Sequence, residues 1–351
     1  MSQMPAVPDP GAVIETPRRR DDPELRSEGV QQTIKPLPAW ERHLPRIYLV
    51  LLIVAVIWLV IYPQGASAYN ITLALTVLLT ISLASSWNII SGFTGYTSFG
   101  HAGFFGIGAY AGALLIFHDL MPWQLAMVAG GLVTGGVALV IGYPTLRLRG
   151  PYFAITMLGL SELARIIVTA WDSLTRGGIG VYLPIVRDTT PNYYAMLVLA
   201  VVTVVVSYFI GTSHFGLKLL SIRDDEVAAQ AMGIDTTRNK QIAFVISSFF
   251  PGVAGAIYAR HVGFIDPPTV FLVIWSIRAI ATAIVGGQGT ILGPIIGAVI
   301  LTLVSEEVWA RDPNLYQVIF GGIIVVVVIF IPGGLISLMQ GWGILPRSRR
   351  L

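Results

Sequence analysis

The stretch Tyr69–Ile90 decides the fold, and it reads YNITLALTVLLTISLASSWNII. Its 22 residues include no Asp, Glu, Lys or Arg. A helix of ~20 predominantly apolar residues is long enough to cross the hydrocarbon core of a bilayer. The stretch therefore predicts a transmembrane helix.

Nine further apolar segments extend this pattern along the chain. They cover residues 47–61, 99–117, 123–146, 152–171, 193–211, 241–264, 271–285, 291–304 and 315–335. A backbone in lipid must satisfy its own hydrogen bonds, which favours helices. Runs such as Val50–Val60 lack the apolar/polar alternation of barrel strands. We therefore predict an all-α, polytopic transmembrane helical bundle with about ten spans.

The composition agrees with a membrane protein. Hydrophobic residues make up 54% of the 351 residues and charged residues only 12%, whereas soluble domains carry about 25% charged residues. The chain has no cysteine, which excludes disulfides, thiolate metal sites and cysteine nucleophiles. Its five histidines show no spacing suited to a metal ion. We expect no cofactor, no metal and no catalytic residue.

The positions of the basic residues predict the orientation. With the N-terminus in the cytoplasm and ten crossings, 16 of the 22 Lys and Arg residues fall on the cytoplasmic side. Only Arg176, Arg187 and Arg311 fall outside. This asymmetry follows the positive-inside rule. It predicts that both termini are cytoplasmic.

The same pattern divides the chain into regions. Residues 1–45 are polar and rich in proline, and such a segment buries too little apolar surface to fold. We expect a disordered cytoplasmic tail there. Residues 46–340 then form the transmembrane permease domain, with a long cytoplasmic loop at 212–240. A second cytoplasmic tail covers 341–351.

The long loop contains a short helix with strong end signals. The acids Asp224, Asp225 and Glu226 suit the positive end of a helix, and they can cap its free N–H groups. Ala228 and Ala229 keep its body slim, and Gly233 suits the left-handed position that ends a helix. Such a helix could dock into a groove of a soluble partner or serve as an ordinary connector.

The loop also carries a resemblance. Ser221–Glu226 (SIRDDE), followed by Ala231–Ile234 (AMGI), resembles the loop that contacts the ATPases in ABC importer permeases, and most closely that of the LivM-type branched-chain amino acid permeases. Other stretches similar to that family, in the same order, are Gly92–Gly95 (GFTG), Ser98–Ala102 (SFGHA), Gly106–Tyr110 (GIGAY), Leu146–Ile155 (LRLRGPYFAI), Ala254–Ala259 (AGAIYA) and Gly286–Thr290 (GGQGT). The resemblance covers about Tyr69–Gly334.

The resemblance implies a division of labour. A periplasmic or lipid-anchored binding protein delivers the substrate, this chain and a homologous permease form the channel, and two cytoplasmic ATPases supply the energy. The residues that it assigns to contact with the ATPases are Arg223, Asp224, Asp225, Glu226, Ala228, Ala229 and Gly233. The chain has no G-x-x-x-x-G-K-[ST] loop, so it does not bind ATP phosphates in the P-loop manner.

Several residues are candidates for a substrate pathway. Glu162 and Arg165 lie three residues apart in one segment, where they can pair on one helix face. Because a charge at the bilayer centre costs ~2.5–3.5 kcal/mol, this face should turn toward protein or water. The pair could line a pathway or brace two helices. The other candidates are Thr94, Gly95, Ser98 and His101 before the third segment, and Thr175, Gly177 and Gly178 outside.

One departure from the family concerns that outer stretch. Family members commonly have Leu-Thr-Gly-Gly, whereas this chain has an arginine, Arg176, between Thr175 and Gly177. The substrate therefore stays open within the family between branched-chain amino acids and urea, short amides or aromatic acids. From other classes, an ion-coupled secondary transporter and a membrane-embedded enzyme are the alternatives. No clustered catalytic residues favour the enzyme.

Overall fold

The structure is a computed structural model that describes residues 54–184, 186–311, 318, 321–322, 325, 329–331 and 333–341. All of them belong to one compact unit. The predicted tail at 1–45 and most of the tenth segment and of the C-terminal tail lie outside the described residues.

The stretch quoted first is helical, as predicted. Helix α3 (Ala68–Trp87) begins where the Ser67 hydroxyl accepts a hydrogen bond from the backbone N–H of Asn70 at 3.3 Å. It continues directly into a π-helical segment, η3 (Asn88–Gly92). Side chains of α3 are buried along most of its length, and Trp87 is 1% exposed. The helix therefore lies inside the bundle, as expected for a helix that is apolar on all faces.

The other segments also form helices. Their bounds are α4 (His101–Phe117), α5 (Trp123–Thr145), α6 (Pro151–Ala170), α8 (Thr190–Thr212), α11 (Thr236–Val262), α12 (Pro267–Val270), α13 (Ile274–Gly286) and α14 (Leu292–Arg311). Among the described residues, six helices are long and apolar enough to cross a membrane, and two apolar helices, Val54–Gln64 and His101–Phe117, are shorter. The prediction of a polytopic helical protein is confirmed, and the count of ten spans stays a prediction.

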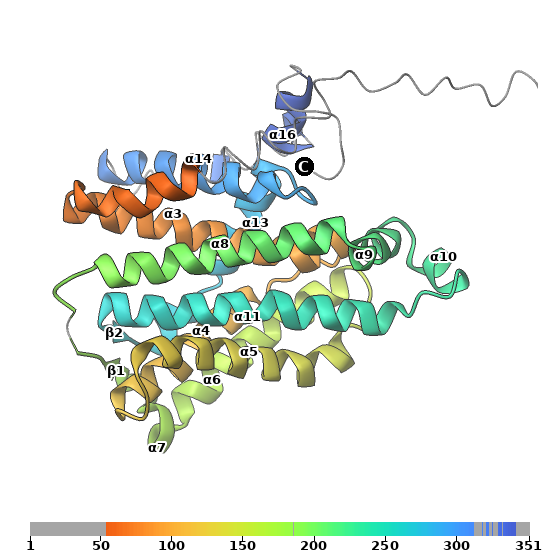
Figure 1. The fold of residues 1–351 in the computed structure, drawn as a ribbon. Coiled ribbons are helices and arrows are strands. Elements are labelled where there is room, and N and C mark those ends of the chain that lie inside the picture. The colour runs from red at the N-terminus through yellow and green to blue at the C-terminus, as the bar shows by residue number, and fades with distance from the viewer. Residues whose placement is uncertain are drawn as a thin grey trace, which may run out of the picture. The chain divides into compact units, whose positions relative to one another are not determined.

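Helix α11 occupies the centre of the bundle. It packs against α3, α4, α5 and α8, and Figure 1 shows it running beside α8 and α5 over their length. Glycines permit this contact: a Cβ added to Gly255 would lie 2.1 Å from the carbonyl oxygen of Phe105, and one added to Gly108 would lie 2.2 Å from that of Gly252. Small residues let membrane helices approach closely in this way.

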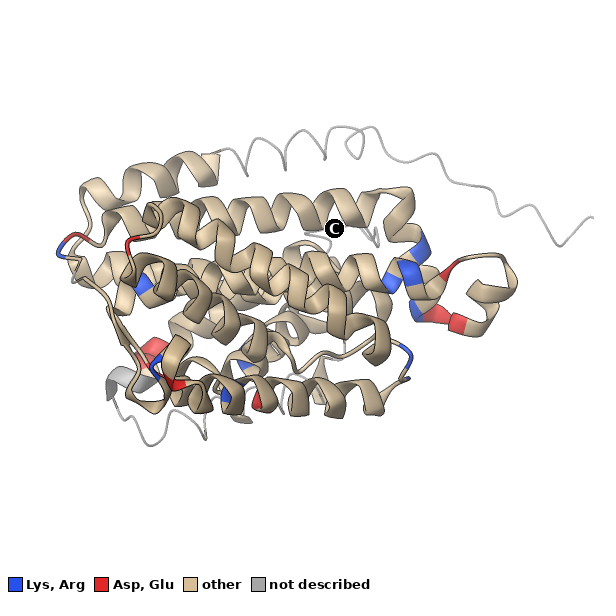
Figure 2. Cartoon of the chain, turned by 90° about the horizontal axis from the view of Figure 1, so that it is seen from below, with Lys and Arg blue, Asp and Glu red and all other residues tan. Residues whose placement is uncertain are grey.

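The two ends of the bundle differ. One end, the α10 end, carries α9 (His214–Asp224) and α10 (Glu226–Ala231). The other, the strand end, carries α7 (Asp172–Thr175), η4 (Gly177–Ile179) and a two-stranded antiparallel sheet. In that sheet β1 (Val181–Tyr182) pairs with β2 (Phe264–Ile265). Figure 2 shows that charged residues gather mainly at these two ends.

The long loop is shorter than predicted. Helix α11 begins at Thr236 rather than at Gln241, so Lys240 lies in the helix, where it is 2% exposed. The prediction placed Lys240 in the loop because the apolar run begins at Gln241, and a buried lysine needs a partner. The structure supplies the partner, as described next. The remaining described elements are η2 (Tyr62–Gln64) and α16 (Gly334–Gly341).

Candidate functional site

The helix predicted in the loop is present as α10. Asp225 is its N-cap: its Oδ1 accepts hydrogen bonds from the N–H groups of Val227 at 2.8 Å and Ala228 at 3.0 Å. Gly233 follows the C-terminal end with φ +83°, a left-handed conformation that favours glycine. The predicted cap and stop are confirmed. Asp224 was assigned wrongly, because it ends α9 instead of opening α10.

Glu226, the first residue of α10, points into the protein. Its Oε1 accepts a hydrogen bond from Lys240 Nζ at 2.7 Å, and its Oε2 accepts one from the Tyr96 hydroxyl at 2.5 Å. Thr236 Oγ1 adds a longer bond to Oε1 at 3.3 Å. The glutamate therefore fixes α10 to the start of α11 and to the segment before α4.

Lys240 completes the network. Its ammonium donates to the Tyr96 hydroxyl at 2.8 Å and to the carbonyl oxygen of Leu146 at 3.1 Å, and it lies 4.2 Å from the centre of the Tyr96 ring. A buried ion pair is stable only with such additional hydrogen bonds. We call Tyr96, Glu226 and Lys240 the loop triad. It joins the loop to the ends of three helices, α4, α5 and α11.

The electrostatics of the loop triad favour one protonation state. Burial raises the pKa of the Glu226 carboxyl, but the hydrogen bonds from Lys240 and Tyr96 outweigh it and hold that pKa below its ordinary value. Burial and the bond to Glu226 raise the pKa of Tyr96. At neutral pH Glu226 is therefore a carboxylate and Tyr96 keeps the proton it donates.

A second link runs through Arg223. Its Nη1 donates a hydrogen bond to the carbonyl oxygen of Gly92 at 2.7 Å. A Cβ added to Gly289, whose φ is +81°, would lie 2.3 Å from the same nitrogen. A Cβ added to Gly95 would lie 3.3 Å from the Arg223 Cγ. The arginine thus lies between two glycine-rich stretches, where side chains would collide with it.

The two glycine-rich stretches are joined to each other. Asn88 Nδ2 donates to the carbonyl oxygen of Thr290 at 2.8 Å, and the Gly289 N–H donates to Asn88 Oδ1 at 2.8 Å. Gln288 Nε2 donates to the carbonyl oxygen of Ser91 at 3.1 Å. Asn88 begins η3, so these bonds hold the turn between α13 and α14 against the π-helical end of α3. A displacement of Arg223 would therefore reach both α3 and α14.

The predicted pathway residues before α4 are packed in this structure. Thr94, Ser98 and His101 are each 0–1% exposed, and Gly95 lies at the surface with φ +77°. Thr94 Oγ1 bonds to the carbonyl oxygen of Ile90 at 2.6 Å, and the Trp87 indole donates to that of Ser98 at 2.9 Å. The three buried residues therefore border no opening in this conformation.

The outer candidates form a tight turn at the strand end. Thr175 Oγ1 donates to the carbonyl oxygens of Val168 at 2.6 Å and Trp171 at 2.7 Å. Arg176 takes the left-handed conformation (φ 60°), and its guanidinium lies 5.2 Å from the centre of the Phe117 ring. Gly177 and Gly178 follow in η4. These residues lie beyond the end of α6, separate from the loop triad.

Glu162 and Arg165 pair within α6, as predicted. Arg165 Nε donates to both carboxylate oxygens, at 3.0 and 2.9 Å, and Nη2 donates to Oε1. The glutamate side chain is 49% exposed and the arginine side chain 32% exposed. The partner of each charge is thus on its own helix, so the pair does not brace two helices of this chain.

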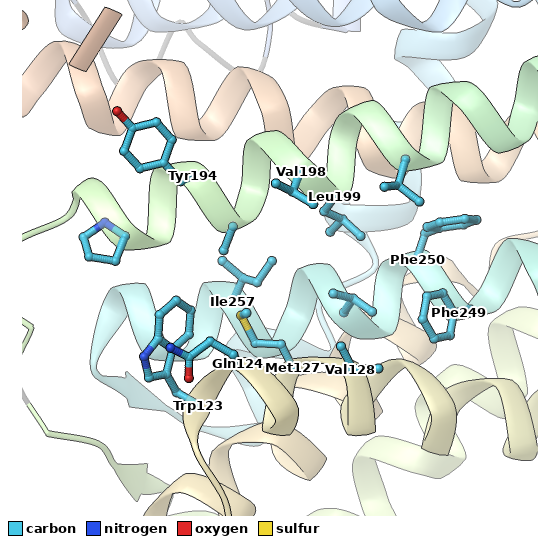
Figure 3. A pocket seen from close by; sticks show the side chains of 14 residues that line it. Trp123, Gln124, Met127, Val128, Tyr194, Val198, Leu199, Phe249, Phe250 and Ile257 are labelled. Atoms are coloured by element: carbon cyan, nitrogen blue, oxygen red, sulfur yellow. The ribbon is translucent and has the colours of Figure 1, made fainter. Parts of the chain in front are cut away.

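The described residues also enclose an apolar groove. It lies between α5 and α8 over α11, has a volume of about 510 Å³, and is shown in Figure 3. Side chains such as Met127, Leu199, Phe249 and Ile257 point into it. Its polar side-chain groups come from Trp123, Gln124 and Tyr194 near one end. No charged side chain lines it to pair with a carboxylate or an ammonium group, so it is not the candidate site for a polar metabolite.

Comparison with known proteins decides the family. Residues 69–328 match the family model described as "Branched-chain amino acid transport system / permease component". The chain belongs to this family. The permease is 31% identical to the permease protein LivM of Salmonella typhimurium, over 83% of this chain and 74% of that protein. It is 30% identical to LivM of Escherichia coli over the same shares.

A second kind of permease also matches. LivH of Escherichia coli, named a high-affinity branched-chain amino acid transport system permease protein, is 25% identical over 73% of this chain and 90% of its own length. No solved structure matches the chain. The family and the apolar helices together make the chain a multi-pass membrane transport protein.

The residues that sequence reasoning missed are Lys240 and Tyr96. Lys240 directly precedes an apolar run, which made it look like the last residue of a polar loop. Tyr96 lay in a glycine-rich stretch that had been considered only as a pathway lining. A lysine directly before an apolar run, combined with an acid in the preceding loop, is the signal that could have indicated the pair of Glu226 and Lys240.

Proposed function

We propose that this chain is the membrane-spanning permease subunit of an ATP-driven importer that moves branched-chain amino acids across the cytoplasmic membrane. The loop triad is the observation that carries the proposal. A short exposed helix, α10, is tied by Glu226 to Lys240 at the start of the central helix α11. The names of the LivM and LivH relatives support the substrate class.

The proposed mechanism uses α10 as the contact to a soluble ATPase. When two ATPase subunits close on ATP, they displace α10, and the loop triad passes this displacement to α11, α5 and the segment before α4. Arg223 passes it to the two glycine-rich stretches. Alternating access then follows from a rigid-body rearrangement of packed helices. No covalent chemistry takes place in the permease, and ATP hydrolysis resides in the partner subunits.

We infer that the contact surface on α10 does not include the Glu226 side chain, which the sequence prediction had placed among the ATPase contacts. Glu226 is turned toward the transmembrane helices, so it positions α10. The side chains that face outward include Val227, 60% exposed, and Met232, 83% exposed. These two are suited to an apolar groove of an ATPase, with Ala228 and Asp225 beside them. Because the ATPases are soluble, this proposal has the α10 end facing the cytoplasm, and with the predicted ten crossings both termini are cytoplasmic as well.

Reconstitution tests the proposal. The permease, a LivH-type partner and two ATPases are assembled in proteoliposomes with a leucine-loaded binding protein outside. ATP inside should drive leucine uptake, and an ATPase variant lacking its P-loop lysine should not. Uptake that persists without hydrolysis would reject the mechanism. Concentrative uptake by this chain alone on a proton or sodium gradient would instead support the secondary transporter.

The same preparation separates the substrate classes. Binding of leucine, urea, short amides and aromatic acids is measured on the partner binding protein, and uptake of each is measured in the vesicles. Uptake of leucine, isoleucine and valine in preference to the others is the expected result. A preference for urea or an amide would keep the importer and replace the substrate.

A further inference from the structure

Helix α6 is the least covered span of the described structure. Only 17% of its most apolar 18-residue window is buried, compared with 39–72% in the other five spans. One face packs on α4: a Cβ added to Gly103 would lie 3.0 Å from Ser161. The other face carries Ile155, Leu158 and Ile166, all exposed. In a membrane, that face meets lipid or another protein.

The ion pair lies on this open side, at membrane depth. At 1.5 Å per residue, Glu162 is about 17 Å and Arg165 about 21 Å from the start of α6, and the hydrocarbon core is ~30 Å thick. Glu162 thus lies about 12 Å or more from either end of α6, too far for its short side chain to reach water. Ionisable groups at such depth almost always face a bundle interior or a water-filled cavity.

The second permease is the occupant that satisfies these charges. The family contains two kinds of permease, and a LivH relative matches 73% of this chain. A junction between two permeases would cover the aliphatic residues of α6 and keep a narrow aqueous space around the pair. Lipid chains would cover the aliphatic residues equally well, but they offer nothing to Glu162 and Arg165.

We propose that the outward face of α6 lies against the second permease and that Glu162 and Arg165 line the substrate path at this junction, where they bind the ammonium and the carboxylate of an amino acid. The inference rests on the proposed function. A pair of opposite charges on adjacent turns of one helix matches a zwitterion, whose two charges are held a few ångströms apart. Arginine suits the carboxylate because its planar fork can form two parallel hydrogen bonds. An uncharged solute such as urea would gain little from the pair.

Binding of an amino acid would replace the ion pair between Glu162 and Arg165. The two side chains now bond to each other at 2.9–3.0 Å. An amino acid entering between them would replace that bond by two charge-assisted bonds of its own. Because the ion pair between Glu162 and Arg165 re-forms when the substrate leaves, release of the substrate is favoured and binding is transient. This suits a path that must release what it binds.

Charge-neutral variants test the pathway role. Glu162→Gln, Arg165→Gln and the double variant are each assembled with partner permease, ATPases and binding protein. The single variants leave one charge alone in the membrane, and they can fail for lack of folding. The double variant removes both charges, so a merely structural pair predicts wild-type uptake from it. Our proposal predicts an assembled complex whose leucine uptake is lowered at least ~10-fold, which corresponds to a loss of about 1.4 kcal/mol.

Cross-linking tests the junction. Ile166 lies one turn after Glu162 on the same face and is 51% exposed, whereas Leu132 belongs to a different helix, α5, where it is 64% exposed near the middle of the helix. In the assembled transporter, Ile166→Cys should cross-link to cysteines in the partner permease, and Leu132→Cys should not. Equal, absent or reversed cross-linking would overturn the junction. Wild-type complex that shows no ATP-driven uptake would refute the proposed function instead, so the two failures are distinguishable.

Discussion

The loop triad makes the sharpest prediction, which concerns the removal of one charge of a buried pair. Glu226→Gln keeps the size of the side chain and removes its charge. It leaves the Lys240 ammonium, 2% exposed, without a counter-charge; its remaining acceptors are the Tyr96 hydroxyl at 2.8 Å, the Leu146 carbonyl oxygen at 3.1 Å and the amide oxygen of the new side chain. Lys240→Met instead leaves the Glu226 carboxylate, 15% exposed, with the Tyr96 hydroxyl.

The magnitudes follow from burial. Breaking a buried pair by removing one partner costs about 3–5 kcal/mol. Because Lys240 retains three uncharged acceptors, we expect the lower end, about 3 kcal/mol, for Glu226→Gln. The carboxylate left by Lys240→Met is closer to water and should cost about 1–3 kcal/mol. The double variant has no buried charge, and pairs replaced together are often neutral in stability. It should regain half or more of the summed single losses, with a coupling energy of about 3 kcal/mol in the cycle.

Reversible unfolding in mixed micelles, followed by tryptophan fluorescence, measures the free energy of unfolding of the four proteins. In proteoliposomes the double variant should remain folded. ATP hydrolysis by the partner ATPases should no longer drive uptake, because the ion pair that links α10 to α11 is lost. The reasoning is refuted if Glu226→Gln is as stable as the wild type, or if the two single losses simply add in the double variant.

Three further outcomes are expected. Gly289→Ala should destabilise the permease by about 1–2 kcal/mol, because its Cβ would collide with Arg223 in a left-handed conformation; Gly136→Ala, with nothing within 4 Å, is the matched control for unfolding titrations. Glu226 contributes stability above pH ~4.3, and this contribution is lost as pH falls through its depressed pKa; a melting-temperature series from pH 7 to pH 3 should show an acid-side drop that Glu226→Gln lacks. Met232→Asp should weaken ATPase binding at least ~10-fold in pull-downs by removing an exposed apolar contact worth about 1.5 kcal/mol, whereas Met232→Leu should bind normally; equal binding by both would exclude Met232 from the interface.

Much of the fold could be predicted because the membrane simplifies it. Apolar runs such as Tyr69–Ile90 must become helices, and the segment starts agree with α4, α5, α6 and α14 to within a few residues. The cap at Asp225 and the stop at Gly233 were also predictable, since both depend on local backbone geometry.

The candidate site was less predictable because it depends on contacts between distant segments. Glu226 and Lys240 are 14 residues apart, and Tyr96 is 130 residues from Glu226. Nothing in the local sequence indicates that the glutamate turns inward rather than toward a partner. The Glu162–Arg165 pair was predictable because its members lie three residues apart on one helix. That the pair lies on an exposed face of α6 could be seen only from the packing of α6 in the structure.

The length of α11 has a consequence for how the two sides of the membrane are coupled. Its 27 residues, with Pro251 inside the helix, extend about 40 Å, with Lys240 near one end and, just past the other, the β2 residues that pair with β1. One continuous helix therefore connects the loop triad at one end of the bundle with the two-stranded sheet at the other. In the proposed mechanism, nucleotide binding to the ATPases shifts the position of α11. Since linkage between two sites is reciprocal, a protein that docks on the two-stranded sheet and favours one position of α11 must change nucleotide affinity by the same factor by which nucleotide changes docking. Docking of a substrate-loaded binding protein would then change the nucleotide affinity of the ATPases before any solute is transported.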